Sequence, residues 1–334
     1  MISSLEKMKI ALQERKNLID DAGGSAIRLF NGFREGDPDW VIECYGSTLV
    51  LNYHNRESGN VLSDAQMIAN AYLLWLPWIK CVLLKNRYST EMSNRQGKII
   101  FGENLTEVIS ELGINYCIDL RINQDCSFYL DTRYLRTWLH QHSSGKKVLN
   151  TFAYTGSLGV AALAGGAQTV VQTDLNRRFL DLARRSTQIN LLPPEKMKII
   201  GGDFYRTIGN LKKDQKLFDY VILDPPFFSS TDGGRVDLFK DPDRLINKVK
   251  PLVAHYGVLV VVNNALYLSG ENFLETLTGL CKDGYMSIEE IIPVPLDVTG
   301  YPNTIEAEPP VPTDPFNHAT KIVILRVKRK DGRV

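Results

Sequence analysis

The chain has 334 residues, of which 44% are hydrophobic and 23% charged, and its formal net charge is +1. This length allows two domains with separate cores, and this composition excludes a disordered or fibrous chain. A net charge so close to zero also argues against a protein that binds nucleic acid tightly through its overall field, so any such contact would need a local basic surface.

The five cysteines are scattered, and they form neither a Cys-x-x-Cys pair nor a set with histidine at metal-ligand spacing. Reduced thiols in a cytosolic protein are the simplest interpretation, and no metal site is expected. No apolar signal segment opens the chain, and no apolar run reaches the length needed to cross a bilayer. We therefore expect a cytoplasmic protein that makes no membrane contact; its oligomeric state is not indicated.

The first 127 residues predict a helix followed by a small α+β domain. Apolar residues recur with helical spacing over residues 3–20, so residues 1–25 are assigned to an N-terminal helix. A second helix, capped by Asp64, is expected over residues 65–76. Residues 26–127 form the predicted small domain. Its strands, separated by turn residues, are expected at residues 26–30, 40–45, 48–53 and 81–85.

From residue 148 onward, apolar strands alternate with helices, which is typical of a parallel α/β sheet. The first four strands are expected at residues 148–152, 169–173, 198–202 and 220–223. A small-residue turn follows the first, and the other three are followed by Asp174, Asp203 and Asp224. Because the carboxyl ends of parallel strands form the ligand crevice, we expect these four ends to converge on one site.

The residues at these ends suit a nucleoside ligand that carries an amino acid. A glycine turn and the helix after it let backbone N–H groups approach a negatively charged group. Asp174 suits the two hydroxyls of a ribose, and Asp203 suits an adenine amino group. Only Gly156 and Gly159 remain of the dinucleotide glycine pattern, which argues against a pyrophosphate cofactor.

This set resembles the S-adenosylmethionine site of class I methyltransferases. The resemblance implies an α/β, Rossmann-like domain of seven strands over residues 128–334, preceded by the small α+β domain. Its last two strands, at residues 285–292 and 320–327, would be antiparallel. The implied cofactor is S-adenosyl-L-methionine. The implied cofactor-binding residues are Arg133, Asn150, Phe152, Ala153, Tyr154, Thr155, Gly156, Asp174, Leu175, Asp203, Phe204 and Asp224.

The fourth strand end carries Asp224-Pro225-Pro226-Phe227, which resembles the motif by which amino-methyltransferases hold a flat, amine-bearing base. The resemblance implies that the Asp224 carboxylate and a proline carbonyl accept hydrogen bonds from the target amine, while Phe227 stacks on the base. Prolines suit this position because they fix φ and carry no N–H. We expect these four residues to be catalytic; the alternative is that the two prolines only end the strand.

Further similarity is to the large-subunit rRNA methyltransferases related to the bacterial cytosine carbon-5 enzyme. It is carried by residues 28–32, by residues 148–156, and by residues 128–133, which resemble that family's Phe-Leu-Asp-Gln-Arg signature with Thr132 in place of Gln. The family implies rRNA as the partner. Its members often carry an N-terminal PUA RNA-binding domain, and here we expect only the first helix in that place.

One departure changes the expected target atom. The cytosine carbon-5 members use a nucleophilic cysteine after the fifth strand of the sheet. Here Asn263-Asn264-Ala265 follow that strand, and the nearest cysteine, Cys281, falls in the next helix, where we expect it to be part of the core. The Asp-Pro-Pro-Phe motif therefore points to an exocyclic amine of adenine or guanine in rRNA instead.

Two further sites are open to more than one interpretation. Arg133 is expected near the methionine carboxylate, although an ion pair with Asp131 is the alternative. A segment rich in proline, residues 293–315, either shapes the base pocket or only connects two strands.

The preferred RNA-contact candidate is a basic group near Tyr88, made of Lys80, Lys85, Arg87 and Arg95.

Three other functions are also compatible with the sequence. The first is methyl transfer to a small molecule or to a protein amide, for which related motifs are used. The second is a noncatalytic RNA-binding or assembly factor that has kept the fold, against which the three intact acids at the strand ends argue. The third is methylation of a ring nitrogen of a base.

Overall fold

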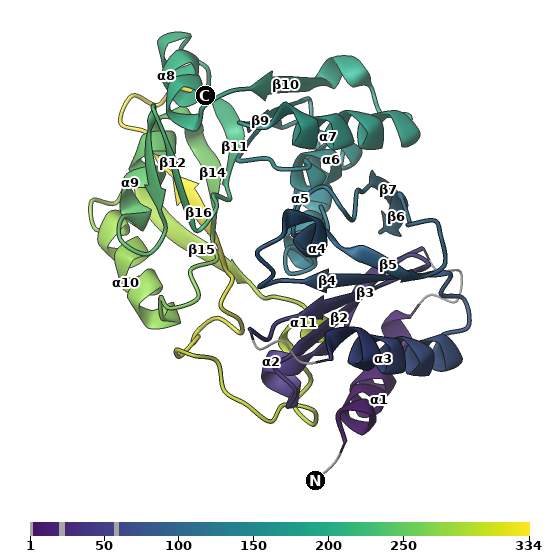
Figure 1. Ribbon diagram of the computed structural model, residues 1–334. Helices are drawn as coiled ribbons and strands as arrows, with labels where there is room; N and C mark the ends of the chain where they lie inside the picture. Colours follow the sequence, from purple (N-terminus) through teal and green to yellow (C-terminus); the bar gives the residue numbers. More distant parts are fainter. Residues whose placement is uncertain (1–2, 20–23, 57–59) are drawn as a thin grey trace. The chain divides into compact units, whose positions relative to one another are not determined.

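In the computed structural model, which describes residues 3–19, 24–56 and 60–334, the chain divides into two compact units (Figure 1). Unit 1 comprises Met1–Asp131 and Pro295–Glu308, and unit 2 comprises Thr132–Val294 and Pro309–Val334. One catalytic domain was expected over residues 128–334, but residues 128–131 and 295–308 group with unit 1 in the structure. No helix in the described part of the chain is long and apolar enough to cross a membrane.

Unit 1 is built on a five-stranded sheet in the order β1-β2-β3-β4-β5, in which β3 and β4 run parallel and the other neighbours antiparallel. The sheet strands are β1 (Ala26–Asn31), β2 (Trp40–Tyr45), β3 (Thr48–Tyr53), β4 (Cys81–Asn86) and β5 (Lys98–Phe101). A separate hairpin joins β6 (Val108–Glu111) to β7 (Ile114–Cys117). The helices are α1 (Ser4–Glu14), α2 (Gly32–Glu35), α3 (Val61–Trp75), α4 (Met92–Gln96) and α11 (Leu296–Thr299).

Helix α1 ends at Glu14, earlier than predicted, and a short 3-10 helix over Lys16–Leu18 follows. The residue between them, Arg15, points into the core of unit 1. The Arg15 side chain is fully buried, and its guanidinium donates two hydrogen bonds to the Glu35 carboxylate, of 3.0 and 2.9 Å. It donates a third, of 3.0 Å, to the carbonyl of Asp297, whose carboxylate accepts the Arg28 N–H at 3.1 Å. These bonds anchor residues 295–308 in unit 1, so this segment is more than a connector between strands.

Unit 2 contains the predicted seven-stranded sheet, in the order β10-β9-β8-β11-β14-β16-β15. Neighbours from β10 to β14 are parallel, and β16 is antiparallel to β14. Strand β16 is also antiparallel to β15, as the resemblance implied for the last two strands. The strands are β8 (Lys147–Thr151), β9 (Thr169–Asp174), β10 (Met197–Gly201), β11 (Phe218–Leu223), β14 (Val253–Asn263), β15 (Met286–Ile292) and β16 (Lys321–Val327). A small hairpin, β12 (Phe228–Thr231) and β13 (Gly234–Asp237), follows β11.

Helices cover both faces of this sheet, because successive apolar side chains on its strands point to opposite faces and are buried on each. On β14, Val258, Val260 and Val262 join the core layer beneath α5 and α6, whereas Leu259 and Val261 join the layer beneath α8, α9 and α10. The two sets of helices flank the sheet in Figure 1. These helices, with α7, are α5 (Arg133–His142), α6 (Ser157–Ala164), α7 (Arg177–Ile189), α8 (Phe204–Lys213), α9 (Pro242–Val249) and α10 (Gly270–Cys281). A sheet buried on both faces explains the continuous apolar runs.

Removing the carboxylate from the buried pair in unit 1 should strongly destabilise that unit. We expect Glu35→Ala to cost about 3–5 kcal/mol, because the Arg15 charge would stay buried without a counter-charge. Urea denaturation followed by tryptophan fluorescence suits this test, since Trp40, Trp75 and Trp78 lie in unit 1. Glu6→Ala, at an exposed position on α1, is the control; a similar loss in both variants would contradict the assigned role of Glu35.

Candidate active site

The carboxyl ends of four parallel strands form one row across the sheet of unit 2. The residues paired in this row, from β11 through β8 and β9 to β10, are Leu223, Thr151, Thr173 and Ile200. Directly after this row the chain leaves the sheet at Phe152 and Asp224, while Asp174 is the last residue of β9. Asp203 follows shortly after the end of β10. The strand ends that the sequence pointed to therefore meet at one edge of the sheet.

The turn between β8 and α6 has an unusual backbone. Its φ angles are 52° at Phe152, 51° at Tyr154 and 78° at Gly156, all in the left-handed region. A Cβ on Gly156 would fall on the Ala183 methyl group and would lie 2.7 Å from Nε2 of Gln172, so only glycine fits. This turn delivers the chain to the N-terminus of α6, where unpaired N–H groups favour a negatively charged ligand group.

The buried side chain of Gln172 supports this turn, although Gln172 was not among the predicted site residues. Gln172 is fully buried on β9; its Nε2 donates to the Gly156 carbonyl at 3.2 Å, and its Oε1 accepts from Asn150 Nδ2 at 2.9 Å. Asn150 is only 1% exposed, so it acts on the turn through Gln172. The signal that could have found this pair is two buried amides in otherwise apolar strands, since buried polar groups need partners.

Asp174 joins the end of β9 to the same turn. Its Oδ2 accepts the Tyr154 N–H at 2.8 Å and its Oδ1 accepts the Asn176 N–H at 2.9 Å. Burial raises the pKa of Asp174, and these backbone hydrogen bonds act in the opposite direction. The Leu175 N–H also contributes to this set of donors. A carboxylate has about four acceptor positions, so it can still accept from a hydroxyl of a ribose. Leu175 follows directly and is 63% exposed.

Asp203 caps the N-terminus of α8 and already accepts hydrogen bonds from several donors. Its Oδ1 accepts the Arg206 N–H at 3.0 Å, and its Oδ2 accepts the Thr231 hydroxyl at 2.5 Å. Partial burial acts to raise the pKa of Asp203, but the Thr231 bond and the N–H groups of Arg206 and Tyr205 outweigh it, so the pKa is lowered. An adenine amino group would have to share this carboxylate with Thr231.

Two stacked aromatic rings lie beside these acids. The Phe152 and Phe204 rings are 4.4 Å apart between centroids and inclined by only 26°. Phe204 is buried, while Phe152 is half-buried at the turn. The pair offers a flat apolar wall of the kind that binds an adenine ring.

The Asp-Pro-Pro-Phe motif lies at the end of β11. Asp224 is half-buried and Pro225 buried, whereas Pro226 is exposed and the Phe227 side chain is 48% exposed. The Phe227 carbonyl accepts the Leu238 N–H at 3.1 Å, which closes the hairpin behind the motif. The motif thus presents a carboxylate and an exposed ring at the edge where the other strands end.

The remaining predicted residues fall into two groups. Ala153 and Thr155 are buried in the turn, where the Ala153 N–H donates to the Thr173 carbonyl at 2.8 Å. Arg133 opens α5 and is half-buried, and its contact with a methionine carboxylate stays a prediction.

Two of the four residues in the predicted basic group of unit 1, Lys85 and Arg87, are held by partners within the unit, whereas Lys80 is exposed and Arg95 is half-buried. Lys85 is fully buried, and its Nζ donates to the backbone carbonyls of residues 123, 124 and 125 at 3.2–3.3 Å. Burial lowers its pKa. Arg87 binds the same loop through the Gln124 carbonyl and, at 2.8 Å, the Asp125 carboxylate. The prediction that Lys85 contacts RNA is therefore wrong, because its charge is satisfied inside the unit.

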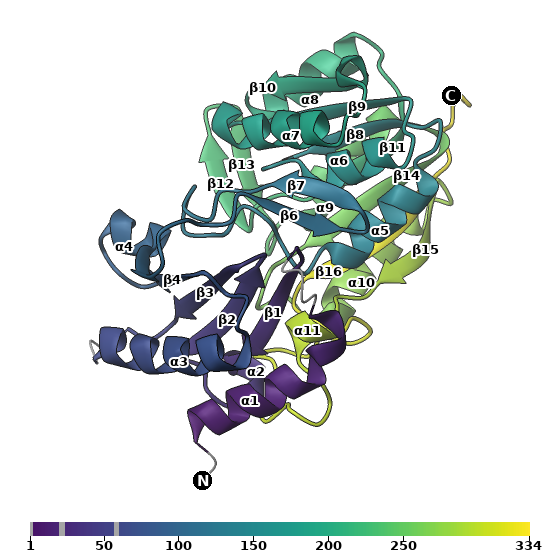
Figure 2. The ribbon, with the colours of Figure 1, turned by 90° about the vertical axis from the view of Figure 1, so that its right-hand side faces the viewer.

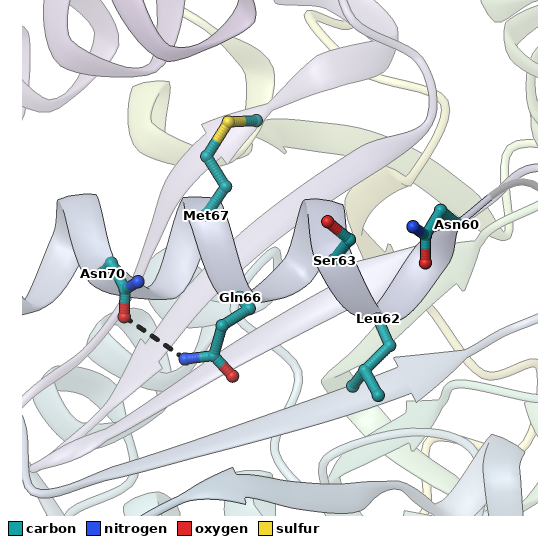
Figure 3. Close-up of a pocket in the computed structure, with 6 residues that line it drawn as sticks. All are labelled: Asn60, Leu62, Ser63, Gln66, Met67 and Asn70. Carbon is teal, nitrogen blue, oxygen red and sulfur yellow. Dashed lines mark hydrogen bonds between the residues drawn. The ribbon is translucent and has the colours of Figure 1, made fainter.

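A surface hollow on α3 in unit 1 offers no catalytic chemistry. Figure 3 shows the side chains that line it, none of which is charged: Asn60, Leu62, Ser63, Gln66, Met67 and Asn70. Gln66 and Asn70 hydrogen-bond to each other at 3.2 Å. No cluster of His, Cys, Asp and Glu able to hold a metal ion occurs in residues 3–19, 24–56 and 60–334.

The chain belongs to the S-adenosylmethionine-dependent methyltransferase family, whose model matches residues 64–286. It is 32% identical, over 77% of its length and 65% of the relative's, to ribosomal RNA large subunit methyltransferase I of Aeromonas salmonicida. It is 33% identical, over 47% of its length and 45% of the relative's, to ribosomal RNA large subunit methyltransferase K of Neisseria meningitidis serogroup B. The chain thus spans less than two thirds of either relative.

The fold is shared with solved structures. The crystal structure of SMU.776 complexed with SAH superposes with a TM-score of 0.83, over 97% of this chain and 80% of that one, at 22% identity.

Substituting the turn glycine should impair cofactor binding. We expect Gly156→Ala to lower the affinity for S-adenosylhomocysteine at least about tenfold, because alanine is strained at this φ and overlaps Gln172 and Ala183. Calorimetric titration measures this directly. Gly209→Ala on α8 is a matched control, since a Cβ there meets nothing within 4 Å and should stabilise the helix by about 0.5–1 kcal/mol. Equal affinities for both variants would contradict the assigned role of the turn.

The Asp174 carboxylate should contribute directly to cofactor affinity. We expect Asp174→Ala to weaken S-adenosylhomocysteine binding roughly 10- to 150-fold, since hydrogen bonds to a charged group contribute about 1.5–3 kcal/mol. Asp181→Ala, at the exposed partner of Arg184 on α7, should leave the affinity unchanged. Unchanged binding by the Asp174 variant in the same calorimetric assay would remove this residue from the site.

Proposed function

We propose that this protein transfers a methyl group from S-adenosylmethionine to an exocyclic amine of a purine base in large-subunit rRNA. The observation that carries the proposal is the row of strand ends, which brings the Gly156 turn, Asp174 and the Asp-Pro-Pro-Phe motif to one edge of the sheet. Names of the relatives support rRNA as the substrate. The motif at the end of β11 supports an amine as the acceptor.

The residues at this edge fit the cofactor by their chemistry. The left-handed turn and the α6 N-terminus suit the methionine carboxylate, and Arg133 is a candidate second contact. Asp174 would hold the ribose hydroxyls, while Phe152 and Phe204 would hold the adenine ring. When bound, S-adenosylmethionine supplies an electrophilic methyl group on a sulfonium sulfur.

The protein's own groups would then position and polarise the acceptor. The Asp224 carboxylate and a carbonyl of Pro225 or Pro226 would accept hydrogen bonds from the target –NH2, aiming its lone pair at the methyl carbon in line with the leaving sulfur. Positive charge develops on the amine nitrogen as the bond forms, and the nearby carboxylate stabilises it. Phe227, whose ring is half exposed, would hold the base by stacking.

Attack on carbon 5 of cytosine is disfavoured by the same structure. That chemistry needs a thiolate beside the ring. The end of β14 instead carries Asn263, which is buried and donates to the Leu238 carbonyl at 3.2 Å. Cys281 packs from α10 against the core of unit 2, and burial raises the pKa of its thiol, which opposes thiolate formation.

Asp224→Ala separates catalysis from cofactor binding. We expect kcat to fall about 100-fold or more, because a preorganised acceptor for the developing charge would be lost. Affinity for S-adenosylhomocysteine should stay within a few-fold of the wild-type value. Loss of cofactor binding with no separate effect on turnover would contradict the assigned role.

Nucleoside mass spectrometry of rRNA identifies the target. The rRNA of a strain lacking the gene is compared with that of its parent and of the strain complemented with Asp224→Ala. Loss of one methylated adenosine or guanosine, not restored by the variant, would support the proposal, and the product would distinguish an exocyclic amine from a ring nitrogen. Loss of a methylcytidine would refute it. An unchanged nucleoside profile would favour a small-molecule or protein substrate, or a noncatalytic role.

A further inference from the structure

The β12–β13 hairpin, labelled in Figure 2, begins directly after the Asp-Pro-Pro-Phe motif. Its two faces carry different side chains. In its antiparallel register Phe228 is opposite Asp237, and Ser230 is opposite Arg235. Because side chains alternate along a strand, these four residues share one face of the ribbon. Ser229, Thr231 and Val236 share the other.

The inner face fixes the hairpin to the cofactor side of unit 2. Val236 is 2% exposed and belongs to the core beneath α8 and α9. The Thr231 hydroxyl donates to Asp203 at 2.5 Å, and the Tyr205 hydroxyl donates to the Arg235 carbonyl. The hairpin is therefore held in place by buried packing and hydrogen bonds next to Asp203.

The outer face carries an aromatic ring that is covered on one side only. The Arg235 guanidinium lies 5.0 Å from the centroid of the Phe228 ring, held there by a 2.5 Å ion pair with Asp237. Phe228 nevertheless remains 52% exposed. A large apolar ring fixed in place and left half open next to a catalytic motif is a ready surface for another flat group.

We propose that Phe228, braced by Arg235, stacks on the nucleotide next to the methylated one in single-stranded RNA. This face favours a base over a phosphate. The Asp237 carboxylate already neutralises the Arg235 guanidinium, so the Phe228 ring is the group left to bind a ligand. Phe227 and Phe228 are consecutive and both rings are about half exposed, so the second ring is available to a neighbour of the base that meets the first. Stacking of this kind tolerates any base.

This inference rests on the proposed function, since it names a contact with the same RNA. The test measures methyl transfer from labelled S-adenosylmethionine to rRNA transcribed in vitro, for the wild type, Phe228→Ala and Phe228→Trp. We expect the alanine variant to raise the KM for RNA about tenfold, the effect of losing one base–aromatic stack, and the tryptophan variant to keep it near the wild-type value. Tyr256→Ala, another exposed aromatic residue of unit 2, is the control.

The outcomes separate the two proposals. If the wild type methylates RNA but the alanine variant has an unchanged KM, the stacking contact is refuted and the proposed function stands. An equal loss in the alanine and tryptophan variants would also refute it, because an aromatic ring would then not be what matters. If the wild type binds S-adenosylhomocysteine but labels no RNA, both proposals fail. Unchanged S-adenosylhomocysteine affinity in the variants shows that the fold is intact.

Discussion

Parallel pairing of β8 with β9 and β11 is the constraint on which the candidate site depends. It sets Thr151, Thr173 and Leu223 level with one another, so the next residue on each strand emerges at the same edge. A shift of one residue in any pair would move every side chain of the strand from one helix-covered face of the sheet to the other. The buried valines and leucines on both faces of the sheet therefore fix the geometry of the site as well as the stability of unit 2.

Much of this architecture was predictable because it follows local patterns. Apolar strands that end on an acid, and the two prolines after Asp224, are short-range signals. They carry the resemblance to class I methyltransferases, and that resemblance implied the seven-stranded sheet. The hairpin that begins at Phe228 was not predicted, since its strands are short and rich in serine, glycine and aspartate. Its position depends on Val236 reaching the core and on Thr231 reaching Asp203, which are contacts that no local pattern encodes.

Buried polar residues account for most of what the sequence analysis missed. Gln172 and Lys85 look like ordinary surface residues in the sequence, yet both are fully buried with their hydrogen bonds satisfied by distant groups. Lys85 was assigned to an RNA surface because charge is usually exposed. The role of a polar side chain inside a strand depends on which group it hydrogen-bonds to. When that group lies far along the chain, it can be identified only from the fold.

The segment containing α11 also affects the order in which the protein can fold during synthesis. Arg15 and Arg28 leave the ribosome early, but Asp297, to which both are hydrogen-bonded, is made more than 250 residues later. At about 5–20 residues per second, the core of unit 1 waits many seconds for its last component. Unit 2 is mostly synthesised in that interval, so the two units mature together, although the N-terminal one is begun first.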